Sequence, residues 1–101
     1  MERKVETDGT VLAIATYRPK PGNKEAFMEL VEKHLPALRS LGLATDKESY
    51  LAKGKDGTII EVFEWTSVNA IRAAHQHPAI SVIWEKMIMI GEFPPLATLD
   101  E

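Results

Sequence analysis

The chain has 101 residues, 45% of them apolar and 27% charged, and a formal net charge of −3. A chain of this length accommodates one hydrophobic core, which excludes a second domain of ordinary size. An acidic balance with scattered lysines and arginines argues against a nucleic-acid partner, and the absence of cysteine excludes disulfides and thiolate metal sites.

The first ten residues, MERKVETDGT, are polar and form a lead-in to a single domain that we place at residues 11–101. They lack the apolar core of a signal peptide. Nowhere does the chain approach the ~20 consecutive apolar residues that span a bilayer. These features predict a cytoplasmic protein with no membrane partner.

Residues 11–17, VLAIATY, predict a first strand, because the run is short, apolar and rich in β-branched residues. The segment RPKPGN ends this strand with two prolines and a glycine. Asn23 is then a natural N-cap for a following helix.

A helix with one buried face is expected from residue 24 to about residue 40, because apolar positions recur there at steps of three and four residues. The residues of this face are Phe27, Leu30, Val31, His34, Leu35, Leu38 and Leu41. Pro36 lies inside the pattern and predicts a kink near Glu32 or an early end of the helix. Gly42 is expected to close it.

Two further strands are expected around the segment KDGT. Residues 43–53 predict a strand with one partly exposed face, and Asp56 and Gly57 predict a two-residue hairpin turn in which both central residues take positive φ. The next strand, TIIEVFEW, alternates between two faces. One face carries Ile59, Glu61, Phe63 and Trp65, and the other carries Ile60, Val62 and Glu64. Both faces are mainly apolar, so this strand is expected at the centre of a sheet and covered on two sides.

Two helical segments and a last strand complete the chain. Ser67 is expected to cap the first segment, whose inner stripe includes His75, and His77 and Pro78 mark the start of the second, which Gly91 ends. The inward residues of the second segment are Ile80, Ile83, Trp84 and Met87. The final stretch, EFPPLATLD, predicts an edge strand, because its prolines cannot donate to a ladder.

The order strand, helix, strand, strand, helix, strand predicts an α+β domain of the ferredoxin-like βαββαβ type with a four-stranded antiparallel sheet. Both helical regions of such a domain cover one face of the sheet and leave the other open. Since the third strand is apolar on both faces, we expect a second copy of the chain to cover the open face as a homodimer.

Two stretches carry a resemblance to a known family: YRPKPGNKEAFMELVEKHLPALRSLGL and IIEVFEWTSVNAIRAAHQHPAISVIWEKM. With the linking hairpin they cover most of residues 11–97, and the sequence resembles the antibiotic biosynthesis monooxygenase-like group of dimeric α/β barrels. The resemblance implies a dimeric α/β barrel. The group includes cofactor-free monooxygenases, haem-degrading enzymes, isomerases, dechlorinating enzymes and proteins with no known activity, so the scaffold by itself does not select a reaction.

The resemblance also bears on individual positions. The haem-degrading branch uses an asparagine, a tryptophan and a histidine where this chain has Tyr17, Ala74 and Trp84, so haem degradation is not expected. The cofactor-free monooxygenases use an asparagine and a tryptophan near the end of the third strand. Trp65 matches that tryptophan, and Glu61 stands in place of the asparagine.

His34 and His75 are the candidate catalytic residues. Both lie on inner stripes of their helices, and near-neutral imidazoles suit proton abstraction from an acidic phenol. The alternative is that each is a packing residue hydrogen-bonded in the core, because a buried imidazole needs partners for its nitrogens. The sequence does not show whether the two lie close together.

His77 is expected at the helix break and not in a metal site, because side chains two residues apart on a helix point about 200° away from each other. Tyr17, Trp65 and Trp84 are the candidate substrate-binding residues, since they offer aromatic surface to a flat ligand. Aromatic residues at such spacing also fill ordinary cores.

These residues predict a monooxygenase-like protein without a metal or organic cofactor, acting on a small aromatic molecule of the phenol or quinone type between helices and sheet. The alternative is a non-catalytic dimeric module of the same fold that binds a small ligand or presents an interaction surface. An open cavity beside His34, His75, Trp65 and Trp84 would favour the enzyme, and a solidly packed interior would exclude it.

Overall fold

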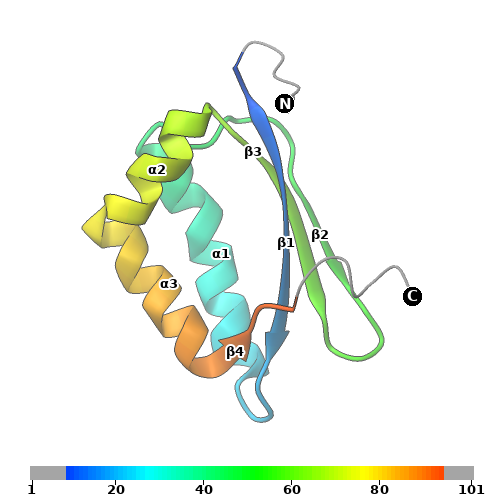
Figure 1. Cartoon of the computed structure of the whole chain (residues 1–101). Coiled ribbons are helices and arrows are strands. Elements are labelled where there is room, and N and C mark those ends of the chain that lie inside the picture. Colours follow the sequence, from blue (N-terminus) through cyan, green and yellow to red (C-terminus); the bar gives the residue numbers. More distant parts are fainter. Residues whose placement is uncertain (1–8, 95–101) are drawn as a thin grey trace.

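The computed structural model describes residues 9–94 and contains a four-stranded sheet and three helices (Figure 1). The elements, in chain order, are β1 (Val11–Pro19), α1 (Lys24–Ser40), β2 (Tyr50–Lys53), β3 (Ile59–Trp65), α2 (Val68–Gln76), α3 (Pro78–Ile90) and β4 (Gly91–Glu92). The strand order is β2-β3-β1-β4, and every neighbouring pair is antiparallel. The predicted ferredoxin-like α+β fold is confirmed.

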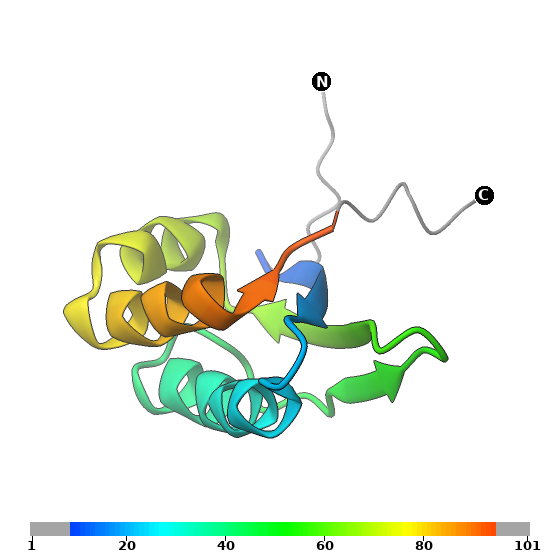
Figure 2. The ribbon, with the colours of Figure 1, turned by 90° about the horizontal axis from the view of Figure 1, so that it is seen from below.

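The molecule has two layers. All three helices lie on one face of the sheet, and the other face carries no element of the described chain (Figures 1 and 2). The helix layer and the sheet enclose two groups of buried side chains, one around Phe63 and Trp65 and the other around Tyr17 and Phe27. Within residues 9–94, no helix is long and apolar enough to cross a membrane.

Strand β3 lies at the centre of the sheet, as its composition predicts, and pairs with β1 from Val11 opposite Trp65 to Tyr17 opposite Ile59. The alternation is also as predicted: Ile59, Glu61, Phe63 and Trp65 are buried toward the helices, and the intervening residues are half-buried on the open face. This register places Glu61 on the same side of the sheet as the side chains of Ala15 and Tyr17.

Helix α1 buries most of the predicted face, with Phe27, Val31, His34, Leu35 and Leu38 inside. Of the other two residues predicted for this face, Leu30 is half-buried and Leu41, just beyond the helix, is exposed. The prediction of an early end at Pro36 is wrong: the helix continues to Ser40, because Pro36 lies on its exposed side and the buried face on either side of it holds the helix against the sheet.

Both ends of α1 lie close to the predicted positions. Asn23 is the N-cap residue, but its side chain accepts no hydrogen bond from the helix, and its amide nitrogen instead faces the Pro21 carbonyl. At the other end, Gly42 takes a positive φ of 76° immediately after the C-cap Leu41.

The β2–β3 hairpin differs from the prediction. Strand β2 covers only four residues, all exposed, whereas residues 43–49 form no strand beyond an isolated bridge between Ala44 and Trp65. The connection has five residues, 54–58, and not two. It is closed by bonds from the Gly54 amide to the Thr58 carbonyl and from the Gly57 amide to the Gly54 carbonyl, and Gly57 takes a φ of 91°. Asp56 and Gly57 lie inside this longer loop, where the Asp56 carboxylate accepts a hydrogen bond from the Thr58 amide at 3.0 Å, so the two residues do not form the turn by themselves.

Two adjoining helices, α2 and α3, follow β3. Ser67 caps α2 by accepting from the Ala70 amide at 3.0 Å. His77 is at once the C-cap of α2 and the N-cap of α3, and Pro78 occupies the first turn of α3. Gly91 ends α3 and begins β4, which pairs at the sheet edge with Arg18 and Pro19. The predicted edge strand, residues 92–100, overlaps β4 only at Glu92: Phe93 and Pro94 form no strand, and the part beyond Pro94 lies outside the described residues.

Candidate functional site

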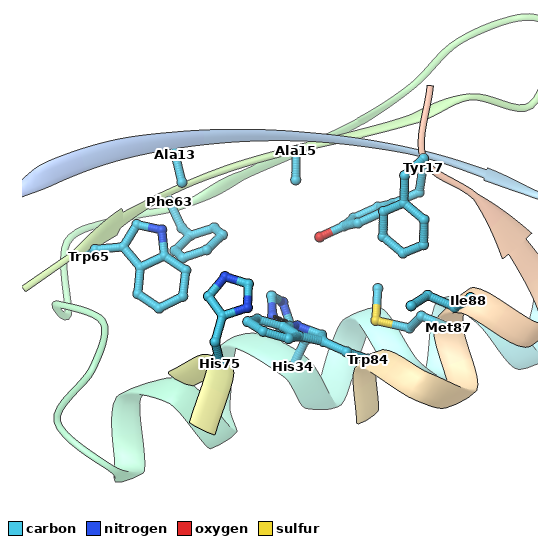
Figure 3. Close-up of a pocket in the computed structure, with 11 residues that line it drawn as sticks. Ala13, Ala15, Tyr17, His34, Phe63, Trp65, His75, Trp84, Met87 and Ile88 are labelled. Atoms are coloured by element: carbon cyan, nitrogen blue, oxygen red, sulfur yellow. Dashed lines mark hydrogen bonds between the residues drawn. The ribbon is translucent and has the colours of Figure 1, made fainter. Parts of the chain in front are cut away.

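A cavity of 370 Å³ lies between the sheet and the helices (Figure 3). Its floor comes from β1 and β3, its roof from all three helices, and one end from the residue that follows β4. The lining residues are Ala13, Ala15, Tyr17, His34, Phe63, Trp65, His75, Trp84, Met87, Ile88 and Phe93. The small side chains of Ala13 and Ala15 on β1 leave the space that the aromatic residues surround.

The five residues that the sequence nominates all line this cavity: His34, His75, Tyr17, Trp65 and Trp84. They come from five elements and meet because β1 and β3 are paired directly below α1, α2 and α3 (Figure 3). The interior between helices and sheet is thus open and not solidly packed. Lining a cavity assigns no role by itself, so the contacts of each residue decide what it can do.

His34 is buried, with 3% of its surface exposed, and both ring nitrogens face other side chains. Its Nε2 accepts a hydrogen bond from the indole Nε1 of Trp84 at 2.9 Å. An indole nitrogen only donates, so Nε2 must carry the lone pair and Nδ1 the proton. That Nδ1 lies 3.5 Å from Oε1 of Glu61 and has no hydrogen-bond partner among the described residues. The ring is therefore held by Trp84 on one side and turned toward a carboxylate on the other.

Glu61 is 4% exposed and accepts a hydrogen bond from the Tyr17 hydroxyl at 2.7 Å through the same oxygen, Oε1, that faces His34. Burial, and then the neighbouring Glu61 carboxylate, raise the pKa of Tyr17 well above its ordinary value of 10.0. The Tyr17 hydroxyl therefore stays protonated at any physiological pH, with its hydrogen directed at Glu61.

His75 differs from His34 in its surroundings. It lies in the last turn of α2, is exposed to solvent, and stacks its ring on Trp84 with the ring centroids 4.8 Å apart. Neither nitrogen has a hydrogen-bond partner among residues 9–94, and Figure 3 shows the ring pointing from the helix into the cavity. His75 is thus the imidazole whose lone pair is accessible to a ligand.

Aromatic contacts make the walls of the cavity stiff. Phe63 and Trp65 lie on the floor with centroids 5.3 Å apart, and Tyr17 meets Phe93 edge to face at 5.5 Å. Offset and edge-to-face pairs of this kind contribute about 0.5–1.5 kcal/mol each beyond their buried area. The space between them is a preformed slot with apolar sides.

Glu61 is a buried charged residue beside the cavity that the sequence did not nominate as a site residue. The alternation of β3 places it on the inner face, and the family resemblance marks it only as a substitute for asparagine. A charged residue on an otherwise apolar inner face is the signal that indicates a buried polar partner. The partners, Tyr17 and His34, come from other elements and cannot be identified from spacing along the chain.

His77 lies outside the cavity, as predicted. Its Nδ1 accepts from the Ala79 amide at 3.2 Å, so it caps α3 and shares no site with His75. Among residues 9–94, no group of three histidine, aspartate or glutamate side chains is arranged to hold a metal ion.

Comparison with known proteins gives similarity in structure alone: no protein-family profile and no curated protein sequence matches the chain. A conserved protein from Bacteroides thetaiotaomicron, described as a possible oxidoreductase, superposes with a TM-score of 0.74 at 8% identity, over 87% of this chain and 94% of its own. SnoaB, a cofactor-independent oxygenase from Streptomyces nogalater, superposes with a TM-score of 0.68 at 14% identity, over 85% and 87%. A conserved protein from Methanosarcina mazei gives 0.68 at 11% identity, over 86% and 90%. At these identities the similarities establish the fold alone, a ferredoxin-like α+β fold of the kind that SnoaB has.

Proposed function

We propose that the protein is a member of the antibiotic biosynthesis monooxygenase-like family and oxidises a small aromatic molecule of the phenol or quinone type without a cofactor. The observation that carries the proposal is the open cavity between helices and sheet, into which His75 points with both nitrogens uncommitted. The fold shared with a cofactor-independent oxygenase supports it. The reducing cytoplasm expected from the sequence is part of the same proposal.

The shape and chemistry of the cavity suit a flat ligand. A volume of 370 Å³ falls within the range of about 300–1,000 Å³ that small-molecule sites occupy. Trp65, Phe63 and Trp84 present ring faces and edges that favour stacking with a fused aromatic system. Polar atoms are few, so they orient a ligand and do not solvate it.

His75 is the proposed general base. It takes a proton from the substrate hydroxyl, and the electron-rich anion transfers an electron to molecular oxygen, after which a carbon–oxygen bond forms and gives a peroxide. The peroxide takes up a proton and loses water. The ring carbon that carried the hydrogen thereby becomes a carbonyl carbon, and the product is a quinone. One oxygen atom enters the product and the other leaves as water, with all electrons supplied by the substrate.

The test is oxygen uptake with a panel of hydroquinones. His75→Gln should lower kcat by about 100-fold or more, because a positioned base contributes about 10²–10⁴ in rate. His77→Asn is the matched control: it removes an imidazole two residues away, keeps a good N-cap for α3, and should leave uptake unchanged. No uptake with any hydroquinone, or equal uptake by the His75 variant, would refute the enzyme.

A second candidate, a ligand-binding module without catalysis, is favoured by one observation. His34, the other histidine expected to act as a base, has one nitrogen bonded to Trp84 and the other turned toward Glu61. A module of this kind would bind aromatic molecules in the cavity and consume no oxygen. Binding without uptake therefore separates it from the enzyme.

The open face of the sheet supports the further proposal of a homodimer. Leu12 and Tyr50 on this face are 65% and 64% exposed, and Ile14 is 46% exposed. One charge at its margin, Glu64, is compensated within the chain: it accepts from Thr45 at 2.9 Å and faces Lys47. Two copies that meet face to face would bring apolar surface together, and a two-fold pairing covers both faces at once.

A further inference from the structure

The Tyr17 hydroxyl has one hydrogen, and that hydrogen is committed. It points to Oε1 of Glu61 at 2.7 Å, while Figure 3 shows the hydroxyl oxygen directed toward the middle of the cavity. A phenolic oxygen whose hydrogen is engaged has only lone pairs to offer. At its Tyr17 end, the cavity therefore presents a hydrogen-bond acceptor and not a donor.

His34 cannot reverse this preference. Its Nε2 already accepts a hydrogen bond from the Trp84 indole, and its Nδ1 hydrogen faces Glu61, so neither nitrogen is free for a ligand. The other polar group that points into the cavity is His75, whose ring packs on Trp84 with the centroids 4.8 Å apart (Figure 3). A ligand that spans the cavity thus meets an acceptor at Tyr17 and an imidazole at His75.

We propose that Glu61 is a positioning residue that turns the Tyr17 hydroxyl into an acceptor and thereby selects ligands with a hydroxyl at each end, the hydroquinone class, over their ethers and over quinones. This inference rests on the proposed function for the ligand's aromatic core. It goes beyond that function by naming Glu61 as the residue that makes the cavity favour a protonated hydroxyl at one end of the ligand.

The same geometry determines which ligand hydroxyl ionises. A hydroxyl that donates to Tyr17 must keep its proton, since a carbonyl or a phenolate there would bring lone pair against lone pair. The Glu61 carboxylate, buried directly behind the Tyr17 oxygen, adds repulsion toward an anion at this end. Deprotonation therefore occurs at the other hydroxyl, the one beside His75.

The experiment compares 1,4-dihydroxynaphthalene with 4-methoxy-1-naphthol, both under nitrogen, by quenching of tryptophan fluorescence. The monoether keeps one hydroxyl for His75 and loses the donor for Tyr17. The native chain should bind the diol roughly tenfold more tightly, the effect of one unmade hydrogen bond. 1,4-Naphthoquinone, with no donor, should bind more weakly than the diol by at least the same factor.

Three variants assign the preference to Glu61. Glu61→Gln keeps a carbonyl oxygen where the Tyr17 hydroxyl and the His34 Nδ1 hydrogen converge, so the tenfold ratio should persist. Glu61→Met is similar in length but has no strong acceptor, which frees the Tyr17 hydrogen for the ligand and should bring the ratio close to one. Tyr17→Phe removes the oxygen itself and should also abolish the ratio.

Equal affinity of the native chain for the two probes would overturn the inference, and so would failure to bind either. A ratio that survives in Glu61→Met and Tyr17→Phe would mean that the added methyl group is rejected by shape, which also overturns it. If Glu61→Met does not fold, Glu61→Leu, which also lacks an acceptor for the Tyr17 hydrogen, takes its place. Because no oxygen is present, the ratio is independent of turnover: a chain that discriminates between the probes but consumes no oxygen keeps this inference and loses the enzyme.

Discussion

At the scale of single residues, the buried polar chain from Trp84 through His34 and Glu61 to Tyr17 is the feature that distinguishes this interior from an ordinary core. The two outer links are hydrogen bonds with a fixed direction, indole to imidazole at 2.9 Å and phenol to carboxylate at 2.7 Å. In the middle link, His34 Nδ1 faces Glu61 Oε1 at 3.5 Å without a hydrogen bond. The low polarity around such a chain strengthens its bonds and makes each unpaired atom costly. We therefore expect these hydrogen bonds to keep the same donors and acceptors while ligands enter and leave the cavity.

The raised pKa of Tyr17 gives a prediction about stability at high pH. Above about pH 10 the unfolded chain loses the Tyr17 proton and the folded chain keeps it, so the unfolded state gains stability as the pH rises. Between pH 9 and pH 11, the free energy of unfolding should fall by about 1.4 kcal/mol more in the native chain than in Tyr17→Phe. Urea denaturation at both pH values measures this, and parallel pH dependence of the two proteins would contradict it.

At the scale of elements, the junction of α3 and β4 fixes one end of the cavity. Gly91 ends the helix and begins the strand with an ordinary extended backbone, φ −154°, so its conformation does not demand glycine. Glycine is required by the lack of space, because a Cβ at this position would lie 2.2 Å from Cε2 of the buried Phe27 ring. Close contact between α1 and this junction is what brings Phe93 to the cavity edge beside Tyr17.

Gly91→Ala should therefore lower the free energy of unfolding by about 1–3 kcal/mol through overpacking. Phe27→Leu removes the ring atoms that a new Cβ would strike, so in that background Gly91→Ala should cost at least about 1 kcal/mol less. Chemical denaturation of the two single variants and the double variant completes the cycle. Additive costs would show that the two residues are not in contact.

At the scale of the whole molecule, one face of the sheet is covered by helices and the other is open. The central strand β3 is apolar on both faces, with Ile60 and Val62 half-buried on the open side, where Val62 lies between the exposed Ile14 and Tyr50. Exposed apolar surface of this extent on a small domain indicates an interaction site. A second copy is the occupant proposed here.

The dimer is tested by mass in solution. The native chain should elute with twice the mass of an 11.3 kDa monomer at micromolar concentration, and Ile14→Glu, which places a charge opposite its own copy, should shift it to the monomer. Val82→Glu is the control, because Val82 is 49% exposed on α3, in the helix layer, and should leave the dimer intact. A monomeric native chain at these concentrations would rule out the proposal.

Local pattern along the chain predicts most of the fold, because periods of two and 3.6 residues state which face of each strand and helix is buried. The inner face of β3, the stripe of α1 and the helix break at His77 all follow from it and are confirmed. Other local predictions are wrong. The helix runs through Pro36 because packing on its buried face outweighs a lost hydrogen bond, and the hairpin loop is longer than Asp56 and Gly57 indicate. Residues 43–49 form only an isolated bridge in place of the predicted strand.

The sequence by itself determined that five candidate residues face inward: His34, His75, Tyr17, Trp65 and Trp84. The pattern of apolar residues within each helix or strand is enough to show which of its faces is buried. Only the tertiary structure decided that these residues surround one cavity, that both ring nitrogens of His34 face other side chains, and that Glu61 holds the Tyr17 hydrogen. These contacts join residues 44 and 50 positions apart. Strand register and the packing of α1 against α3 determine them, and neither is a local property of the chain.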